Sequence, residues 1–461
     1  MKFSKNRKWR FIMHEKHNKF VSKWGFILAC VGSAVGMANV WGFPYKLGSN
    51  GGGAFLLIYI AFVILFGYVG LSAEYAIGRR SGTGTLGSYA FAWKHGRKNR
   101  ETVGKILGWL PLTGSITIAV GYAVIIAYVL KAFTQSLFGS IMTVEPGQCF
   151  HTFAFQPFSV VPYHAAVIIA TLLTIVFGAH TIEKTNKVMM PLFFILFAAL
   201  AVRIAFLPDA MTGYAFLFIP DWSHLKNPSV WITAMGQAFF SLSITGSGMI
   251  VYGAYLSKTH DCVGGAKNTA FFDTIAALVA ALVMIPACYA YRMDPAGGPG
   301  LLFVVLPAIL QQMPGGRIFG IILYLVVVFG GISSLQNMLE VVAESLLHTF
   351  KRWKRTPVIT VLGAAVFGIG VFMEPIAETK GAILGGWGPW MDLVSTYIIP
   401  IGAVLGALSW FWVLKKEELL DEVNTGSGKR YGNGWYYLGK YVYTLFALIL
   451  CIVALARGEG F

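Results

Sequence analysis

Two short runs of glycine and small polar residues interrupt hydrophobic stretches of this chain, and oxygen-bearing side chains lie at their ends. The runs are residues 32–39 (GSAVGMAN) and 241–248 (SLSITGSG). Asn39 ends the first run, and Ser241 and Ser243 begin the second. Irregular backbone at membrane depth survives only where it lines a cavity enclosed by protein. The carbonyl, amide and hydroxyl oxygens gathered there are ligands that a small hard cation such as Na⁺ requires.

Further polar residues inside apolar stretches could complete such a site. Asp273 lies within FFDTIAALV, and Ser333 and Ser334 follow a pair of glycines. A carboxylate inside a membrane span costs about 2.5–3.5 kcal/mol on insertion scales, so we expect Asp273 to have a partner and a function. The two serines could instead bond back to their own helix, Asn39 could cap a helix break, and Glu74 could form an interfacial ion pair.

The same two breaks suit an anionic group of a substrate. Half-helices that begin at a break present their positive ends to the cavity, and this favours a carboxylate. Tyr122, in the middle of a hydrophobic stretch, could donate its hydroxyl to that carboxylate. Phe239 and Phe240 directly precede the second break and could cover the substrate. Packing between helices is the alternative role of these three aromatic residues.

The composition assigns these runs to a membrane protein. Of the 461 residues, 56% are hydrophobic and 12% are charged, which is too apolar for a soluble protein of this size. About eleven stretches are long enough to cross about 30 Å of hydrocarbon as helices. They are roughly residues 24–46, 54–77, 106–136, 160–178, 186–207, 231–256, 268–291, 316–347, 357–373, 392–414 and 436–456.

The formal net charge of +16 fits a membrane topology better than a nucleic-acid partner. Most of the 36 Lys and Arg fall in residues 1–23 and in alternate loops, as the positive-inside rule predicts for a cytoplasmic N-terminus. An odd number of spans then places Phe461 outside. We expect residues 1–23 to be a basic cytoplasmic segment without a cleaved signal peptide. The sequence has no metal-ligand cluster, nucleophile–base pair or phosphate loop, so we do not expect an enzyme.

The order of the spans predicts two repeats of opposite orientation. Repeat one would cover about residues 24–207 and repeat two about 231–414, each with an odd number of spans. The two interruptions then fall in the first helix of each repeat, which is where secondary transporters bind their substrates. The last span, 436–456, lies outside the repeat, and 24–461 is expected to be a single domain. The Gly- and Pro-rich loop 292–315 is expected to dip back toward the protein.

Five motifs in order resemble the neurotransmitter:sodium symporters, especially their bacterial amino-acid members, over about residues 22–415. The resemblance implies an all-α polytopic membrane protein with the leucine-transporter-like fold, an inverted 5+5 repeat and unwound helices 1 and 6. The motifs are residues 32–44 (GSAVGMANVWGFP), 50–55 (NGGGAF), 183–191 (EK, then P), 236–243 (GQAFFSLS) and 294–301 (DPAGGPGL).

The resemblance also implies the residues of each site. One sodium ion would bind the substrate carboxylate, the carbonyl of Ala34, and Asn39, Ser241 and Asp273. A second would bind the carbonyls of Gly32, Val35 and Gly330 and the hydroxyls of Ser333 and Ser334. The substrate pocket would be lined by Ser33, Ala34, Gly36, Met37, Ala38, Ile118, Tyr122, Phe239, Phe240, Ser241, Ser243, Gly246, Ser334 and Met338.

The resemblance further predicts the coupling ion and the substrate class. Na⁺ would be the coupling ion. Asp273 stands where many relatives have asparagine, and a nearby acid does the work of chloride in chloride-independent bacterial members, so we do not expect chloride. Asp273 and Glu74 are candidates for moving a proton on the return step. Gly36 occupies the position where monoamine carriers have an aspartate, so we expect an amino acid as substrate.

Several positions depart from the family pattern on the outer side. Gly42 replaces the arginine that forms an outer gate with an acid of the tenth span, and this leaves Asp392 without its usual partner. Outer gating would then depend on Tyr122, Phe240 and other contacts. Gly246 replaces a large apolar side chain, and we expect this to free space of about one ring in the pocket.

The inner side departs as well. His17 and His348 occupy the positions of an inner Arg–Asp gate pair, and Tyr255 is a further gating candidate. The two histidines could make this gate sensitive to pH or could be solvated loop residues. Thr181 stands ten residues before Pro191 where relatives often have glycine, which argues against helix-five unwinding as a sodium exit route.

These observations predict Na⁺-coupled uptake of a bulky hydrophobic or aromatic amino acid by alternating access. The alternative on the same fold is a weakly or non-sodium-coupled carrier of indole-like or amine compounds. A channel or a substrate-sensing receptor is a further alternative. The expected partners are a small-molecule substrate and membrane lipid, with no nucleic acid. We expect a monomer or weak oligomer that passes many times through a bacterial-type inner (plasma) membrane.

Overall fold

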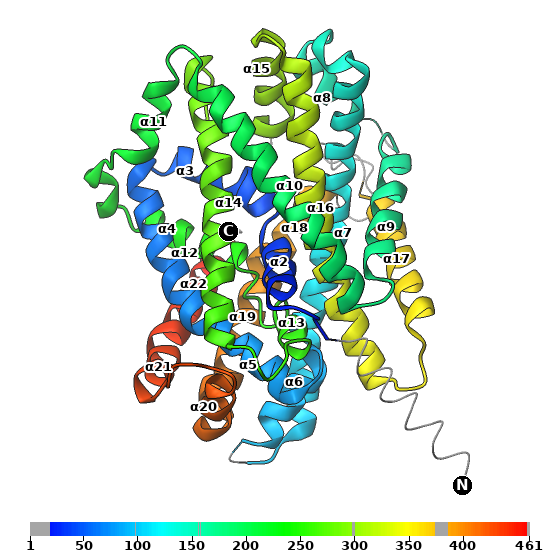
Figure 1. The fold of residues 1–461 in the computed structure, drawn as a ribbon, viewed down its shortest axis with the longest axis vertical. Helices are drawn as coiled ribbons and strands as arrows, with labels where there is room; N and C mark the ends of the chain where they lie inside the picture. The colour runs from blue at the N-terminus through cyan, green and yellow to red at the C-terminus, as the bar shows by residue number, and fades with distance from the viewer. Residues whose placement is uncertain are drawn as a thin grey trace.

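The computed structural model describes residues 19–96, 98–154, 156, 158–296, 300–373 and 386–458. They form a bundle of helices, most of which run along one long axis (Figure 1). The α-helices are α2 (Lys23–Ala34), α3 (Phe43–Ser49), α4 (Gly53–Phe66), α5 (Ser72–Ser81), α6 (Thr85–Lys94), α7 (Glu101–Phe138), α8 (Pro146–Ala154), α9 (Val161–Ile175), α10 (Ala179–Ala205), α11 (Ala210–Phe218), α12 (Pro228–Ser241), α13 (Ile250–Ala254), α14 (Cys262–Ala290), α15 (Leu306–Gln312), α16 (Gly316–Thr349), α17 (Arg355–Val371), α18 (Trp387–Asp392), α19 (Ile399–Leu408), α20 (Lys416–Asn424), α21 (Asn433–Tyr437) and α22 (Thr444–Arg457).

Short helical turns of other types join or extend these helices. Those with π-helical geometry are η1 (Ala38–Gly42), η2 (Gly67–Leu71), η5 (Leu301–Val305), η6 (Leu393–Ile398), η7 (Ser409–Val413) and η8 (Leu438–Tyr443). Two are 3-10 turns, η3 (Ser140–Met142) and η4 (Trp222–Lys226).

Helical segments occupy every predicted span. Within the described ranges, seven continuous segments are long and apolar enough to cross a membrane, and a bent pair makes an eighth. The remaining predicted spans correspond to the shorter helices α9 and α17 and to the broken pair α12 and α13. The seven are Gly53–Ser81, Glu101–Phe138, Ala179–Ala205, Cys262–Ala290, Gly316–Thr349, Trp387–Val413 and Asn433–Arg457.

The helix of the fifth predicted span begins about two helical turns before the predicted membrane-crossing stretch. The prediction began at residue 186, whereas α10 begins at Ala179. Charged and polar side chains in residues 179–187 lowered the apparent hydropathy of that stretch. Two of them, Glu183 and Asn186, are nevertheless buried against other helices. Glu183 accepts hydrogen bonds from the Val21 N–H (2.6 Å) and the Ser22 hydroxyl (2.9 Å), and so fixes the start of α2.

The two predicted interruptions are real breaks in the helices. Between α2 and the η1–α3 segment the axis bends by 56°. Val35, at this break, has extended backbone with φ −74° and ψ 113°. The second break runs from residue 242 to residue 249, between α12 and α13. There Ser243 (φ +54°) and Gly246 (φ +76°) take up left-handed backbone, which glycine adopts without a steric penalty.

The broken helices lie at the centre of the bundle. In Figure 1, α2 and α13 occupy its middle, with α10, α14, α16 and α7 beside them and α9 and α17 at one edge. In the predicted re-entrant loop, η5 leads into α15, which lies at the upper end of the bundle in Figure 1. Leu301, Leu302 and Phe303 of η5 are buried, in agreement with a loop that packs back onto the protein, although residues 297–299 lie outside the described part.

An ion pair that is buried on both sides links α5 to α20 near the lower end of the bundle in Figure 1. Arg79 Nε lies 2.5 Å from Glu422 Oε1, and both side chains are 2% exposed. Arg79 also donates to the carbonyl oxygens of Glu422 (2.6 Å) and Thr425 (2.9 Å). The neighbouring Arg80 pairs with Glu418 at 2.6 Å, but this pair is 36% and 26% exposed.

We expect Arg79→Ala to destabilise the protein far more than Arg80→Ala. Removal of one partner of a buried ion pair leaves an uncompensated charge and costs about 3–5 kcal/mol. An exposed pair contributes at most about 1 kcal/mol. The unfolding midpoints of the two purified variants in the same detergent measure the difference. Equal midpoints would contradict the structural role of Arg79.

Candidate functional site

Asn39, Ser241 and Asp273 form one hydrogen-bonded cluster, and all three are fully buried. Asn39 Nδ2 donates to Asp273 Oδ1 (2.7 Å) and to Ser241 Oγ (3.1 Å). The Ser241 hydroxyl lies 2.8 Å and 2.9 Å from the two Asp273 carboxylate oxygens. Tyr59 donates to Ser241 Oγ at 3.3 Å. The cluster joins η1 to α12, α14 and α4.

The composition of this cluster suits a cation. Within the described ranges no lysine, arginine or histidine forms an ion pair with Asp273, and the side chains that donate hydrogen bonds to it are neutral. A buried carboxylate that has only neutral partners retains its negative charge only at a considerable free-energy cost. Na⁺ would supply the missing positive charge, and the Ser241 hydroxyl and Asp273 carboxylate oxygens are ligands that it accepts. The Asn39 amide turns its nitrogen to Asp273, and its oxygen accepts a hydrogen bond from the Gly36 N–H (3.1 Å) at the first break.

A second group of oxygens lies where the end of α2 meets α16. The Ser334 hydroxyl lies 3.1 Å from the Val35 carbonyl oxygen, 3.2 Å from that of Ser33 and 3.5 Å from that of Gly32. The carbonyls in the last turn of a helix have no partner within that helix, so they are free to bind another group. Ser333 donates to the Gly330 carbonyl at 2.9 Å, which is the bond back to its own helix that was considered as the alternative for this residue. The structure therefore brings together the five residues predicted for the second sodium ion.

Tyr122 connects α7 to the first break. Its hydroxyl oxygen accepts a hydrogen bond from the Met37 N–H at 2.9 Å. A Cβ atom at Gly36 would lie 2.3 Å from that hydroxyl and 2.4 Å from Ser334 Oγ. Only glycine permits α7 and α16 to approach the break so closely. Near Gly36 the Tyr122 hydroxyl thus meets the backbone of the break, where the Met37 N–H donates to Tyr122 and the Gly36 N–H donates to Asn39 Oδ1 (3.1 Å).

A pocket of about 640 Å³, including its open mouth, extends from this point along α7. Its α7 wall follows one helix face from Tyr122 through Ile118 to Pro111, a length of about 16 Å at 1.5 Å per residue. Ten predicted substrate residues line it: Ser33, Ala34, Gly36, Ala38, Ile118, Tyr122, Phe240, Ser243, Ser334 and Met338.

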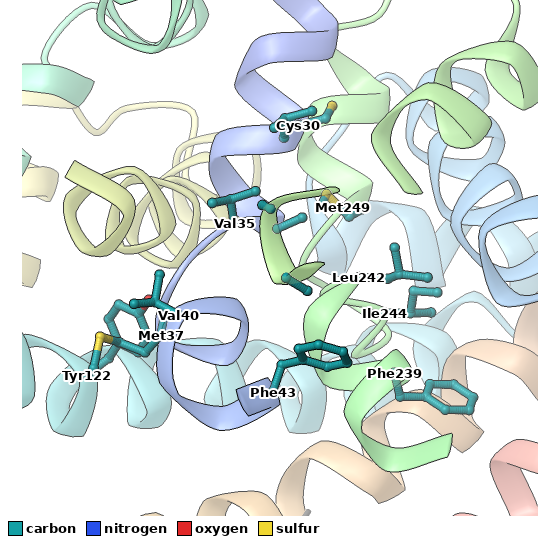
Figure 2. Close-up of a cluster of buried hydrophobic side chains, with 14 of the residues drawn as sticks. Cys30, Val35, Met37, Val40, Phe43, Tyr122, Phe239, Leu242, Ile244 and Met249 are labelled. Carbon is teal, nitrogen blue, oxygen red and sulfur yellow. The ribbon is translucent and has the colours of Figure 1, made fainter. Parts of the chain in front are cut away.

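Four predicted substrate residues do not line the pocket. Ser241 belongs to the Asp273 cluster, and Met37 contributes its backbone N–H to Tyr122. Figure 2 shows Met37 beside Tyr122, with Phe239 on the other side of the breaks, pointing away from them. The Phe239 ring packs on Phe66 with ring centroids 4.3 Å apart.

The expected space at Gly246 is already filled. A Cβ atom at Gly246 would lie 2.2 Å from the Gly402 carbonyl oxygen and 2.8 Å from the Tyr89 hydroxyl. The position therefore faces α19 and α6, and Thr245 lines the pocket in its place. Sequence position within a break does not determine which way a Cβ points, because the backbone there has no helical periodicity.

Glu74 holds the second break from α5. Its fully buried carboxylate accepts hydrogen bonds from the N–H groups of Gly246 (2.9 Å) and Met249 (3.1 Å). The interfacial ion pair considered for Glu74 is not its role in the structure. The carboxylate instead satisfies two backbone groups that the unwound segment leaves without helical partners.

The predicted gating residues are spread over both ends of the bundle. Tyr255 donates to Glu340 and, at 3.2 Å, to Glu344, and Glu340 also pairs with Arg355. This cluster of Tyr255, Glu340, Glu344 and Arg355 joins α13, α16 and α17.

The other gating candidates are more isolated. Asp392 is exposed at the end of α18, and no ion pair of Asp392 occurs among the residues described. His348 is also exposed and lines a separate cavity beside α6 and α7. His17 lies outside the described residues. Tyr255 thus bonds to charged side chains of α16, one of which also pairs with α17. Asp392 and His348 do not line the pocket that holds Tyr122.

Sequence analysis missed two polar features of this region. Lys46 Nζ on α3 donates to Gln237 Oε1 of α12 at 2.9 Å. Gln237 Nε2 in turn donates to the Ala38 carbonyl at 2.8 Å. Lys46, which lies four residues after Gly42, therefore links α3 to α12. Asn337, on the pocket wall, donates to the Gly248 carbonyl at 2.9 Å. Both residues interrupt apolar stretches, and this was the signal that could have identified them.

Comparisons with known proteins agree with this geometry. A family model described as the sodium:neurotransmitter symporter family matches residues 17–159 and 157–459. An uncharacterized sodium-dependent transporter of Bacillus subtilis is 32% identical over 451 residues, which are 95% of this chain and 97% of the relative. One from Methanocaldococcus jannaschii is 30% identical over 448 residues, 91% and 87% of the two chains.

A solved structure has the same architecture. MhsT in complex with L-phenylalanine matches with a TM-score of 0.82 and 31% sequence identity, over 95% of this chain and 99% of MhsT. The fold predicted from the five motifs is therefore confirmed.

We expect Glu74→Ala to weaken the second break. The change leaves two buried N–H groups without an acceptor, at about 1–3 kcal/mol each. Glu74→Gln is the matched control, because it retains an oxygen for one of them and should unfold at an intermediate temperature. Thermal unfolding in detergent measures the midpoints of the three proteins. We expect the wild type to have the highest midpoint, Glu74→Gln an intermediate one and Glu74→Ala the lowest. An unchanged midpoint in Glu74→Ala would contradict the role assigned to the carboxylate.

Proposed function

The chain belongs to the sodium:neurotransmitter symporter family, and on this premise we propose that it takes up a bulky hydrophobic or aromatic amino acid together with Na⁺. It is a multi-pass membrane protein and a sodium-coupled transporter, not an enzyme. The amino-acid class, the direction of transport and the residues of each site form the proposal.

The cluster around Asp273 carries the proposal of ion coupling. Na⁺ bound to Asn39, Ser241 and Asp273 would neutralise a buried carboxylate that otherwise has only neutral partners. The ion would lie close to the pocket, because Asn39 is three residues after Gly36 in the chain. The fixed negative charge of Asp273 would make a bound anion unnecessary, so chloride is not required.

The pocket supports a bulky substrate. Its carboxylate end is formed by Gly36, Tyr122 and Ser334, and the wall continues for about 16 Å along α7. Gly114 and Ser115 are small residues that leave room for a ring along this wall. The related transporter MhsT was solved in complex with L-phenylalanine, an aromatic amino acid. The proposal rests on this length and these small residues, and no longer on Gly246.

One residue of the pocket wall favours a substrate whose side chain carries a donor. Asn337 is 3% exposed, and its Oδ1 has no hydrogen-bond partner among the described residues. Its Nδ2 is held by the Gly248 carbonyl, so the oxygen is the free end of the amide. An indole N–H or a phenol hydroxyl would satisfy it, which favours tryptophan or tyrosine over phenylalanine.

Alternating access would open the pocket to each side in turn. We assign the end that carries α6 and α20 to the cytoplasm, in keeping with the basic loops there, and the membrane to the bacterial inner membrane. The cluster of Tyr255, Glu340 and Arg355 would then close the cytoplasmic side, and the Lys46–Gln237 contact would lie toward the outside.

Uptake into proteoliposomes tests the proposal. We expect an inward Na⁺ gradient to drive tryptophan uptake, replacement of Na⁺ by K⁺ to abolish it, and replacement of chloride by gluconate to leave it unchanged. Tryptophan and tyrosine should compete at least about tenfold more strongly than alanine, because burial of a ring adds about 1.5–3 kcal/mol. A preference for alanine would contradict the substrate class. Equal competition by indole or tryptamine, unchanged in K⁺, would favour the uncoupled carrier of indole-like compounds.

We expect Asn337→Leu to change the binding affinities of tryptophan and phenylalanine by different amounts. The loss of one hydrogen bond is expected to weaken tryptophan binding by up to about tenfold while phenylalanine binding changes little. Met338→Leu, an apolar exchange at the next residue of the pocket wall, should affect both substrates alike. Binding of each radiolabelled amino acid to the purified variants gives the ratio. A parallel loss of both amino acids in Asn337→Leu would contradict the donor hypothesis.

A further inference from the structure

Asn186 is a buried polar residue on α10 that neither cluster described above includes. Its side chain is 0% exposed although α10 is a long, apolar helix. The helix is continuous from Ala179 to Ala205, so Asn186 does not lie at a break or at a cap. A polar side chain fixed inside a membrane span is expected to have a functional partner.

Two acceptors determine the orientation of the Asn186 amide. Nδ2 donates to the Ile182 carbonyl oxygen (2.9 Å) and to Gln336 Oε1 of α16 (2.8 Å). Gln336 in turn donates through Nε2 to Thr185 Oγ1 at 3.1 Å. Since the Ile182 carbonyl is backbone and can only accept, the amide nitrogen must face it. The amide oxygen is therefore forced to point the other way.

The oxygen points toward α2 and finds no donor. Oδ1 lies 2.1 Å from the position that a Cβ atom of Gly32 would occupy, and Ser333 Cβ lies 3.2 Å from the same position. Among the described residues Oδ1 has no hydrogen-bond partner. A buried amide oxygen without a partner costs about 1–3 kcal/mol, so its retention calls for a ligand.

We propose that Asn186 supplies a side-chain carbonyl oxygen to the second sodium site from the side of α10. The oxygen contacts Gly32 and lies beside Ser333, two of the five residues proposed for that site. An amide oxygen carries partial negative charge and is a ligand that Na⁺ accepts. The site would thus be bounded by three helices, α2, α16 and α10, and not by two. This inference rests on the proposed sodium coupling and extends it.

The arrangement also gives α10 a role that does not require it to unwind. Thr181 occupies a position where relatives often have glycine, and its hydroxyl bonds to the Gly178 carbonyl at 3.1 Å in the first turn of the helix. Asn186 lies more than one turn further along an intact helix.

Binding of ²²Na⁺ to the purified full-length chain in detergent, with choline replacing Na⁺, tests the proposal. Asn186→Leu removes the oxygen at similar volume and should raise the half-saturating Na⁺ concentration about tenfold, a magnitude typical of groups that support a metal site. Gln336→Met removes one acceptor of the Asn186 amide nitrogen but leaves the Asn186 oxygen and the bond to Ile182 in place, so it should raise the half-saturating Na⁺ concentration clearly less than Asn186→Leu does.

Asn186→Asp keeps an oxygen and adds negative charge toward Gly32, so at pH 8 it should lower the half-saturating concentration. A half-saturating concentration in Asn186→Leu equal to that in Gln336→Met would overturn the proposal. If Asn186→Leu does not fold, an unchanged value in Asn186→Asp would overturn it. Absence of ²²Na⁺ binding to the wild-type chain would instead contradict the proposed sodium coupling itself.

Discussion

The organisation of this protein depends on one constraint, which is that the backbone of two broken helices must be satisfied inside a membrane. Lipid offers no hydrogen bonds, so each carbonyl and N–H freed at the breaks needs a partner within the protein. Glu74 accepts the N–H groups of Gly246 and Met249, and Tyr122 accepts that of Met37. The carbonyls at the end of α2 face the Ser334 hydroxyl. The continuous helices around the breaks are thus the source of their stability.

The same arrangement supplies the chemistry of a transporter. The oxygens at Asp273 and at the end of α2 are those proposed to bind Na⁺, and Ala34, Gly36 and Ser334 beside the first break line the pocket. The two halves of the first broken helix, α2 and η1–α3, both pack on α14 but have different hydrogen-bond partners. Glu183 of α10 holds the start of α2, and Gln237 of α12 bonds to Ala38 of η1.

Much of the fold was predictable because hydrophobic length and glycine content determine it. The breaks near Gly36 and Gly246 and the burial of Asp273 followed from the sequence. The direction of side chains did not, since it depends on tertiary packing. Gly246 faces α19 and not the pocket. Glu183 and Asn186 lowered the hydropathy of the fifth span, although both are buried. Lys46 and Asn337 carry polar groups into the site from positions that no motif marked.

An experimental structure of the full chain, determined in Na⁺ with tryptophan present, tests the central claim most directly. The account predicts tryptophan in the pocket, with its carboxylate at Gly36 and Tyr122, its ring along α7, and an ion at Asn39, Ser241 and Asp273. Tryptophan bound outside this pocket would contradict the account. So would a structure in which a cationic side chain of the protein pairs with Asp273 and no ion lies between the two breaks.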